Sequence, residues 1–85
     1  MSRLKKTLDE VLSGRSDQSI RFDALRSLLA SLAFEERIRG DHHIFTRAAV
    51  TEIINLQPRS DGTAKPYQVK QVRTILTNYA IGLEP

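Results

Sequence analysis

The fold of this chain is decided by residues 34–57, which read FEERIRGDHHIFTRAAVTEIINLQ. β-branched side chains recur in short segments here, and Gly40 and Asp41 between two of them favour a tight hairpin. A looser turn is expected near Ala48 and Ala49, which give no strong signal of their own. We expect three antiparallel strands over residues 35–39, 42–47 and 51–57.

Amphipathic helices are expected on both sides of this region. Apolar residues recur with helical spacing from Phe22 to Leu32 and again from Val69 to Tyr79. Asp23 suits the first turn of the earlier helix, where a negative charge meets the positive end of the helix dipole. Pro66 suits the first turn of the later helix, and Gly82 suits its end.

A further helix is predicted at the N-terminus, over residues 3–13, with Gly14 as its left-handed cap. A polar connector follows it, so we expect two parts: residues 1–19, which hold this helix and connector, and a domain over residues 20–85. The helix either docks on the domain or contributes to an interface with a partner. The resulting fold class is α+β, with a three-stranded antiparallel sheet that carries its helices on one face.

Composition narrows the class of protein. The 85 residues suffice for one small core, and 13 basic against 10 acidic residues give a net charge of +3, which leans toward a polyanionic partner. Cysteine is absent, so disulfides and thiolate metal sites are excluded. The N-terminus has no secretory pattern, and no segment approaches the roughly 20 apolar residues of a membrane span. We therefore expect a cytoplasmic protein without membrane contact.

Two adjacent histidines follow the predicted hairpin. Because side chains alternate across a strand, His42 should face opposite to His43 and Phe45. Phe45 then suits the core, although an aromatic ring can also stack on a base. An imidazole titrates at about pH 6.5, so His42 can exchange a proton with a substrate near neutral pH. The histidines point apart and lack a Glu-x-x-His spacing, so we expect neither a metal nor another cofactor.

Two segments carry a resemblance to a known family. Residues 32–45 read LAFEERIRGDHHIF and residues 64–73 read AKPYQVKQVR. These segments resemble the HicA toxin family, whose members join a helix ending in Gly-Phe to a Gly-Ser-His-His-Ile-Phe-like hairpin. The resemblance covers about residues 20–82. It implies a fold similar to a double-stranded-RNA-binding domain, an endoribonuclease activity on mRNA, and neutralisation by a HicB-like antitoxin protein.

The resemblance also implies roles for particular residues. The family's catalytic histidine maps onto His42. Asp41 stands where serine is usual, Gln57 stands where many members place a second histidine, and Ala33 replaces the usual glycine before Phe34. Cationic side chains would stabilise charge on the phosphoryl oxygens in such a reaction. The candidate RNA-binding residues are Arg37, Arg39, His43, Lys65, Lys70 and Arg73.

Other interpretations of the same residues stay open. A domain of this kind can bind RNA by shape and phosphate contacts without cutting it, or can serve protein interaction alone. Lys70 and Arg73, three residues apart on one helical face, suit phosphate contacts but also suit an ordinary solvated surface. Tyr67 is a candidate for stacking on a base.

Overall fold

Three helices and one three-stranded antiparallel sheet make up residues 2–83, the part of the chain that the computed structural model describes. The predicted α+β class is confirmed. In chain order the elements are α1 (Arg3–Ser13), α2 (Phe22–Ser31), β1 (Glu35–Arg39), β2 (His42–Thr46), β3 (Ile54–Leu56) and α3 (Pro66–Asn78).

The sheet has the order β1-β2-β3, and both neighbouring pairs are antiparallel. Gly40 adopts a φ of 60° in the two-residue turn between β1 and β2, which confirms the predicted tight hairpin. The third strand is shorter than the expected 51–57. Its first residues leave the sheet because the Thr51 amide donates a hydrogen bond to the Tyr79 hydroxyl at 3.3 Å instead of to β2.

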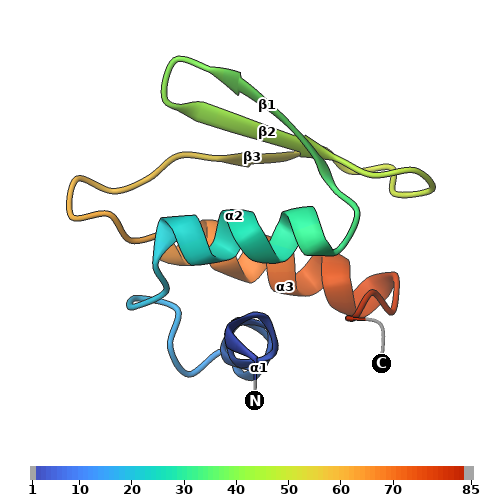
Figure 1. Ribbon diagram of the computed structural model, residues 1–85, viewed down its shortest axis with the longest axis horizontal. Helices are drawn as coiled ribbons and strands as arrows, with labels where there is room; N and C mark the ends of the chain where they lie inside the picture. The colour runs from blue at the N-terminus through green and yellow to red at the C-terminus, as the bar shows by residue number, and fades with distance from the viewer. Residues whose placement is uncertain (1, 84–85) are drawn as a thin grey trace.

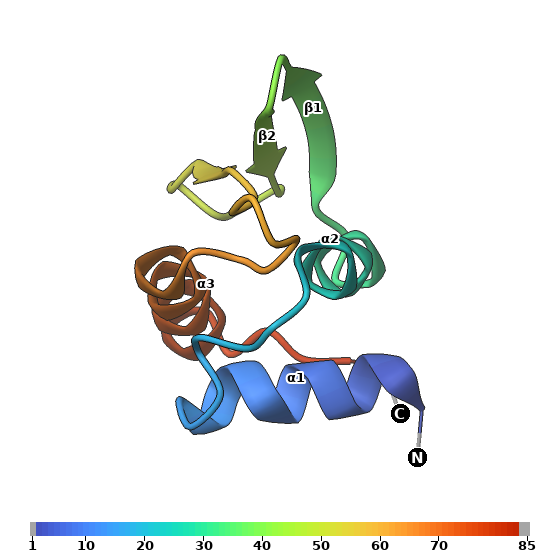
Figure 2. The ribbon, with the colours of Figure 1, turned by 90° about the vertical axis from the view of Figure 1, so that its left-hand side faces the viewer.

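The helices lie on one face of the sheet, as predicted. Figure 1 shows the sheet above α2 and α3, with α1 below them, and Figure 2 shows α1 running across beneath that pair. Side chains of β2 and β3 that point toward the helices are buried, whereas those on the opposite face are more open to solvent. The largest fully buried side chains are Phe45, Leu25, Leu28, Leu29, Ile54, Leu56, Leu76, Val11, Val69 and Val72.

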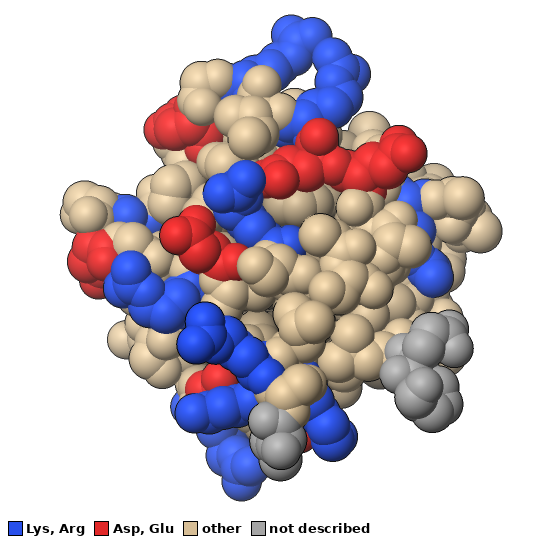
Figure 3. All heavy atoms as spheres, viewed as in Figure 1, with Lys and Arg blue, Asp and Glu red and all other residues tan. Residues whose placement is uncertain are grey.

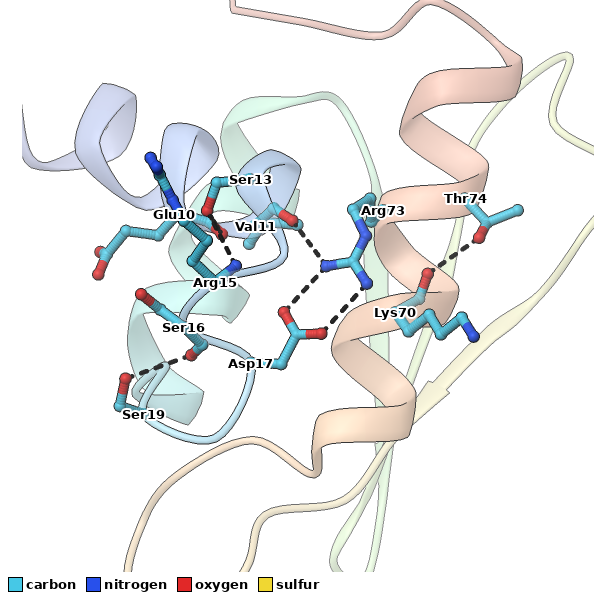
Figure 4. Close-up of polar contacts among 10 residues, drawn as sticks. All are labelled: Glu10, Val11, Ser13, Arg15, Ser16, Asp17, Ser19, Lys70, Arg73 and Thr74. Carbon is cyan, nitrogen blue, oxygen red and sulfur yellow. Dashed lines mark hydrogen bonds and ion pairs between the residues drawn. The ribbon is translucent and has the colours of Figure 1, made fainter.

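Helix α1 packs into the same core as the rest of the chain. It ends at Gly14, whose φ of 72° confirms the predicted left-handed cap, and it buries Leu8 and Val11 against α2 and α3. Arg73 of α3 holds α1 and the connector that follows it. Its guanidinium donates to the Asp17 carboxylate at 2.9 and 3.1 Å and to the Val11 carbonyl at 3.0 Å (Figure 4). The docking role expected for α1 is therefore confirmed.

Alanines in the left-handed conformation end the other two helices. Ala33 follows α2 with a φ of 70°, a conformation that glycine adopts at less cost than alanine. Ala80 has a φ of 52° after α3, and the Ile81 amide then donates to the Leu76 carbonyl at 2.9 Å. The expected stop at Gly82 is therefore wrong, because this cap lets Ile81 enter the core.

Candidate functional site

The open face of the sheet gathers His42 and two arginines. His42 begins β2, and its side chain is 50% exposed. Arg39 of β1 pairs directly with His42, and Arg37 pairs with Ile44 two residues further on. Because directly paired residues of antiparallel strands project from the same face, both guanidinium groups share the face of His42. Strand alternation thus brings three of the predicted site residues together.

The His42 ring lies between two oxygen atoms. Its Nδ1 is 3.3 Å from the Asn55 Oδ1, and its Nε2 is 3.8 Å from the Asp41 Oδ1. A proton on Nδ1 can donate to the amide oxygen, whereas 3.8 Å is too long for a hydrogen bond from Nε2. In the tautomer with its proton on Nδ1, that nitrogen donates to Asn55 and Nε2 carries the lone pair that can accept a proton from a substrate.

A chain of polar contacts connects the start of α3 to this histidine. Lys65 Nζ donates to the Gln57 Oε1 at 3.0 Å, and Gln57 Nε2 donates to the Asp41 Oδ2 at 2.6 Å. The Gln57 amide lowers the pKa of Asp41 below its ordinary value, and the charges of His42 and Lys65 act in the same direction. Asp41 is thus held as a carboxylate beside His42.

His43 lies on the covered face of the sheet, opposite to His42. Its side chain is only 12% exposed, its Nδ1 donates to the Glu36 Oε2 at 2.7 Å, and its ring meets the Phe22 ring edge-on at 4.9 Å between centroids. Arg26 of α2 donates to the same carboxylate at 2.8 and 3.1 Å and, with His43, lowers the pKa of Glu36. The structure thus separates His43 from the other candidate RNA contacts.

Arg73 and Lys70 do not form a common cationic surface. Arg73 is engaged by Asp17 and Val11 on the α1 side, and its side chain is 22% exposed. Figure 4 shows the Lys70 amino group pointing away from that guanidinium. Lys70 instead lines a separate hollow on α3 together with Tyr67. The two cationic groups are therefore directed apart, and Arg73 ties α1 to α3.

Positive charge is spread over more than the sheet. Figure 3 shows Lys and Arg side chains gathered around α1 in the lower part of this view and again at the top, beside the sheet, with acidic side chains between the two groups. The basic residues of α1 are Arg3, Lys5 and Lys6. The distribution of charge therefore does not identify one RNA-binding surface. The open face of the sheet differs from the other basic surface because His42 lies beside its arginines.

Nothing in the sequence indicates that Asn55 belongs to the site, and Gln57 stands out there only as a departure from the family pattern. Ile44 pairs with Asn55, so Asn55 lies on the same face of the sheet as His42. Gln57 follows two residues later, directly after the end of β3. The signal available in the sequence is this two-residue spacing of amides on the strand beside the histidine, and it can be interpreted only once the register of the strands is known.

Comparisons with known proteins add no assignment. No protein-family model, no curated protein and no solved structure gives a significant match to this chain. Within residues 2–83, no group of three or more histidine or acidic side chains has the arrangement of a metal site. None of the helices in that same range is both long and apolar enough to cross a membrane.

Proposed function

We propose that this protein is a metal-independent endoribonuclease that binds RNA on the open face of its sheet and cuts it with His42. The observation that carries the proposal is the half-exposed imidazole of His42, with Arg39 directly opposite and the Asn55 Oδ1 3.3 Å from its Nδ1. The resemblance of residues 20–82 to HicA toxins supports the same function. It also supports a fold similar to a double-stranded-RNA-binding domain.

The chemistry follows from these groups. The ribose 2′-oxygen attacks the adjacent phosphorus, which forms a 2′-O–P bond and breaks the bond from phosphorus to the 5′-oxygen of the next nucleotide. His42 carries one of the two protons that move: it takes the 2′ proton as a base or delivers one to the leaving oxygen as an acid. The products are a 2′,3′-cyclic phosphate and a 5′-hydroxyl. Arg37 and Arg39 stabilise the charge that develops on the phosphoryl oxygens.

Cleavage by matched variants tests this proposal. A long unstructured RNA is incubated in chelator with the wild type, His42→Ala and His43→Ala, and the fragment ends are mapped. We expect wild type and His43→Ala to cut and leave cyclic-phosphate ends, because His43 faces the helices. His42→Ala should bind RNA and leave it intact. Undiminished cutting by His42→Ala would refute the assignment.

Two other results would favour one of the two non-enzymatic classes of protein. RNA binding by the wild type without any cleavage would identify a non-enzymatic RNA-binding module. Neither binding nor cleavage would identify a protein-interaction domain.

The biological role proposed with this activity is that of a cytoplasmic toxin acting on mRNA and silenced by a HicB-like antitoxin. A partner that covers His42 would be the simplest inhibitor, because that side chain is open to solvent. Expression of the wild-type chain alone should arrest growth of a bacterial host, whereas His42→Ala should not. Equal growth with both chains would contradict the toxin role.

A further inference from the structure

One aromatic ring of this protein is left largely in solvent. The three phenylalanines are buried in the core. Tyr79 is fixed by its hydroxyl, which donates to the Glu52 Oε1 at 2.6 Å and accepts from the Thr51 amide. Tyr67 is 67% exposed, and its hydroxyl has no hydrogen-bond partner within residues 2–83. Core packing therefore does not account for Tyr67, and its ring is accessible to a ligand.

The position of Tyr67 is set by contacts to the candidate site. It lies in the first turn of α3, directly after Pro66. The side-chain oxygen of the next residue, Gln68, accepts a hydrogen bond from the backbone N–H of Gln57 at 3.0 Å. Lys65 donates to the side-chain oxygen of the same Gln57. Gln57 in turn holds Asp41 beside His42. The helix turn that carries Tyr67 is thus anchored to the end of β3 next to the histidine.

Lys70 provides a cation on the same side of the helix. Tyr67 and Lys70 are three residues apart, so they lie one above the other, and both line a hollow of about 370 Å³ between α3 and Glu52. Ile75 contributes to the apolar part of the lining. Lys70 forms no ion pair with any residue in the described range 2–83. An open aromatic ring and an unpaired ammonium group are thus presented together.

We propose that Tyr67 and Lys70 hold one unpaired nucleotide of single-stranded RNA beside the cleavage site. The base stacks on the Tyr67 ring, and its phosphate contacts Lys70. Stacking on a protein ring needs a base whose face is free, which single strands offer and the interior of a duplex does not. This inference rests on the proposed ribonuclease function, and it adds a site on α3 that requires an unpaired base.

The arrangement gives positioning with little preference for sequence, because every base has a face that can stack. The strand would run from the open sheet face, past Lys65, onto the first turn of α3. The contact from Lys65 to Gln57 makes this path continuous with the surroundings of His42. Tyr67 is a positioning residue in this proposal, since it touches a neighbouring nucleotide and not the reacting atoms.

Tyrosine fluorescence reports the stacking directly. The chain has two tyrosines and no tryptophan, so in a Tyr79→Phe, His42→Ala protein all emission comes from Tyr67 and the RNA stays intact. The probe is a short, end-labelled oligoadenylate, whose binding is measured independently by the anisotropy of its label. We expect emission to fall in parallel with binding. In His42→Ala protein, Tyr67→Ala should weaken binding roughly tenfold, whereas Tyr67→Phe should keep it, since a phenyl ring still stacks.

Two controls separate the base from the phosphate. An oligonucleotide with abasic sugars should bind Tyr67→Ala and its parent protein equally, because it has nothing to stack. Lys70→Ala should weaken the binding of normal and abasic strands alike and should reduce the salt dependence of the affinity. Lys5→Ala on α1 should change neither the affinity nor its salt dependence. In wild-type background, Tyr67→Ala should raise the RNA concentration needed for half-maximal cleavage more than it lowers the maximal rate.

The failure of this inference can be told apart from failure of the proposed function. If the oligoadenylate binds and RNA is cut, but Tyr67 emission is unchanged and Tyr67→Ala binds normally, the stacking site is refuted and the ribonuclease assignment stands. If a fully paired duplex is bound and cut as well as the single strand, the substrate class is refuted. If the wild type binds no RNA, both proposals fall together.

Discussion

Replacing Asp17 by asparagine tests whether the connector locks α1 onto the fold. The wild-type carboxylate accepts both hydrogen bonds from Arg73 at 2.9 and 3.1 Å, and the side chains are only 22% and 20% exposed. A hydrogen bond to a charged group contributes about 1.5–3 kcal/mol when it is well shielded. Asparagine keeps one acceptor and loses the charge, so we expect a loss of about 1.5 kcal/mol, or roughly 6 to 12 °C in Tm for a chain of this size.

Thermal unfolding followed by circular dichroism at neutral pH measures this loss, with Asp9→Asn as the matched control. Asp9 makes the same kind of charge pair with Lys5, but at 3.7 Å and with the two side chains 60% and 52% exposed, where pairs contribute less than about 1 kcal/mol. Asp9→Asn should therefore shift Tm by at most a few degrees. Equal shifts for the two variants would refute the claim that Asp17 anchors α1 through Arg73.

Three further predictions concern stability. Arg26 lowers the pKa of Glu36 below its ordinary value of 4.5. The stability from this pair is therefore complete above that value and is lost as pH falls through the folded-state pKa. When the unfolding free energy is measured against pH in the acid range, Glu36→Gln should lose less of it than the wild type. Gly62 has a φ of 85°, which strains any residue that carries a β-carbon, whereas the nearby Arg21 guanidinium is the end of a flexible side chain and can move aside. Gly62→Ala should therefore lower the unfolding free energy in urea by about 1–2 kcal/mol, whereas Gly82→Ala, in open space, should leave it nearly unchanged. Ala33→Gly should relieve the left-handed strain and raise Tm by about 3 °C, and a lower Tm would contradict this explanation.

Much of the fold is predictable because local chemistry and packing agree. Gly40 has the positive φ that its turn requires, and the alternation through His42, His43 and Phe45 matches the exposed and covered faces of β2. The bounds of α1 are also predictable, because its apolar residues have helical spacing and Gly14 caps its end. In these segments each residue's intrinsic preference coincides with its place in the core.

The errors arise where a distant residue overrides the local pattern. Thr51 and Ile53 are β-branched, yet residues 51–53 lie outside β3, and the Thr51 amide donates to the Tyr79 hydroxyl instead of to a strand. Ala80 ends α3 against its own preference because the following Ile81 gains burial in the core.

The candidate site likewise combines features that local sequence predicts with features that depend on distant residues. His42, Arg37 and Arg39 are close in sequence and share a face through strand pairing alone. The role of Arg73 depends on Asp17, fifty-six positions away, and no spacing in the sequence indicates that contact. Asn55 likewise reaches His42 only through the register of β2 and β3.

We propose that His42 moves a proton in an attack by the ribose 2′-hydroxyl. Its most direct test is single-turnover cleavage, in chelator, of one RNA and of its copy with 2′-deoxyribose throughout. We expect the wild type to cut the RNA and not the deoxy copy, and His42→Ala to cut neither. Cleavage of both strands at similar rates, or an RNA left intact by wild-type protein that binds it, would contradict this role of His42.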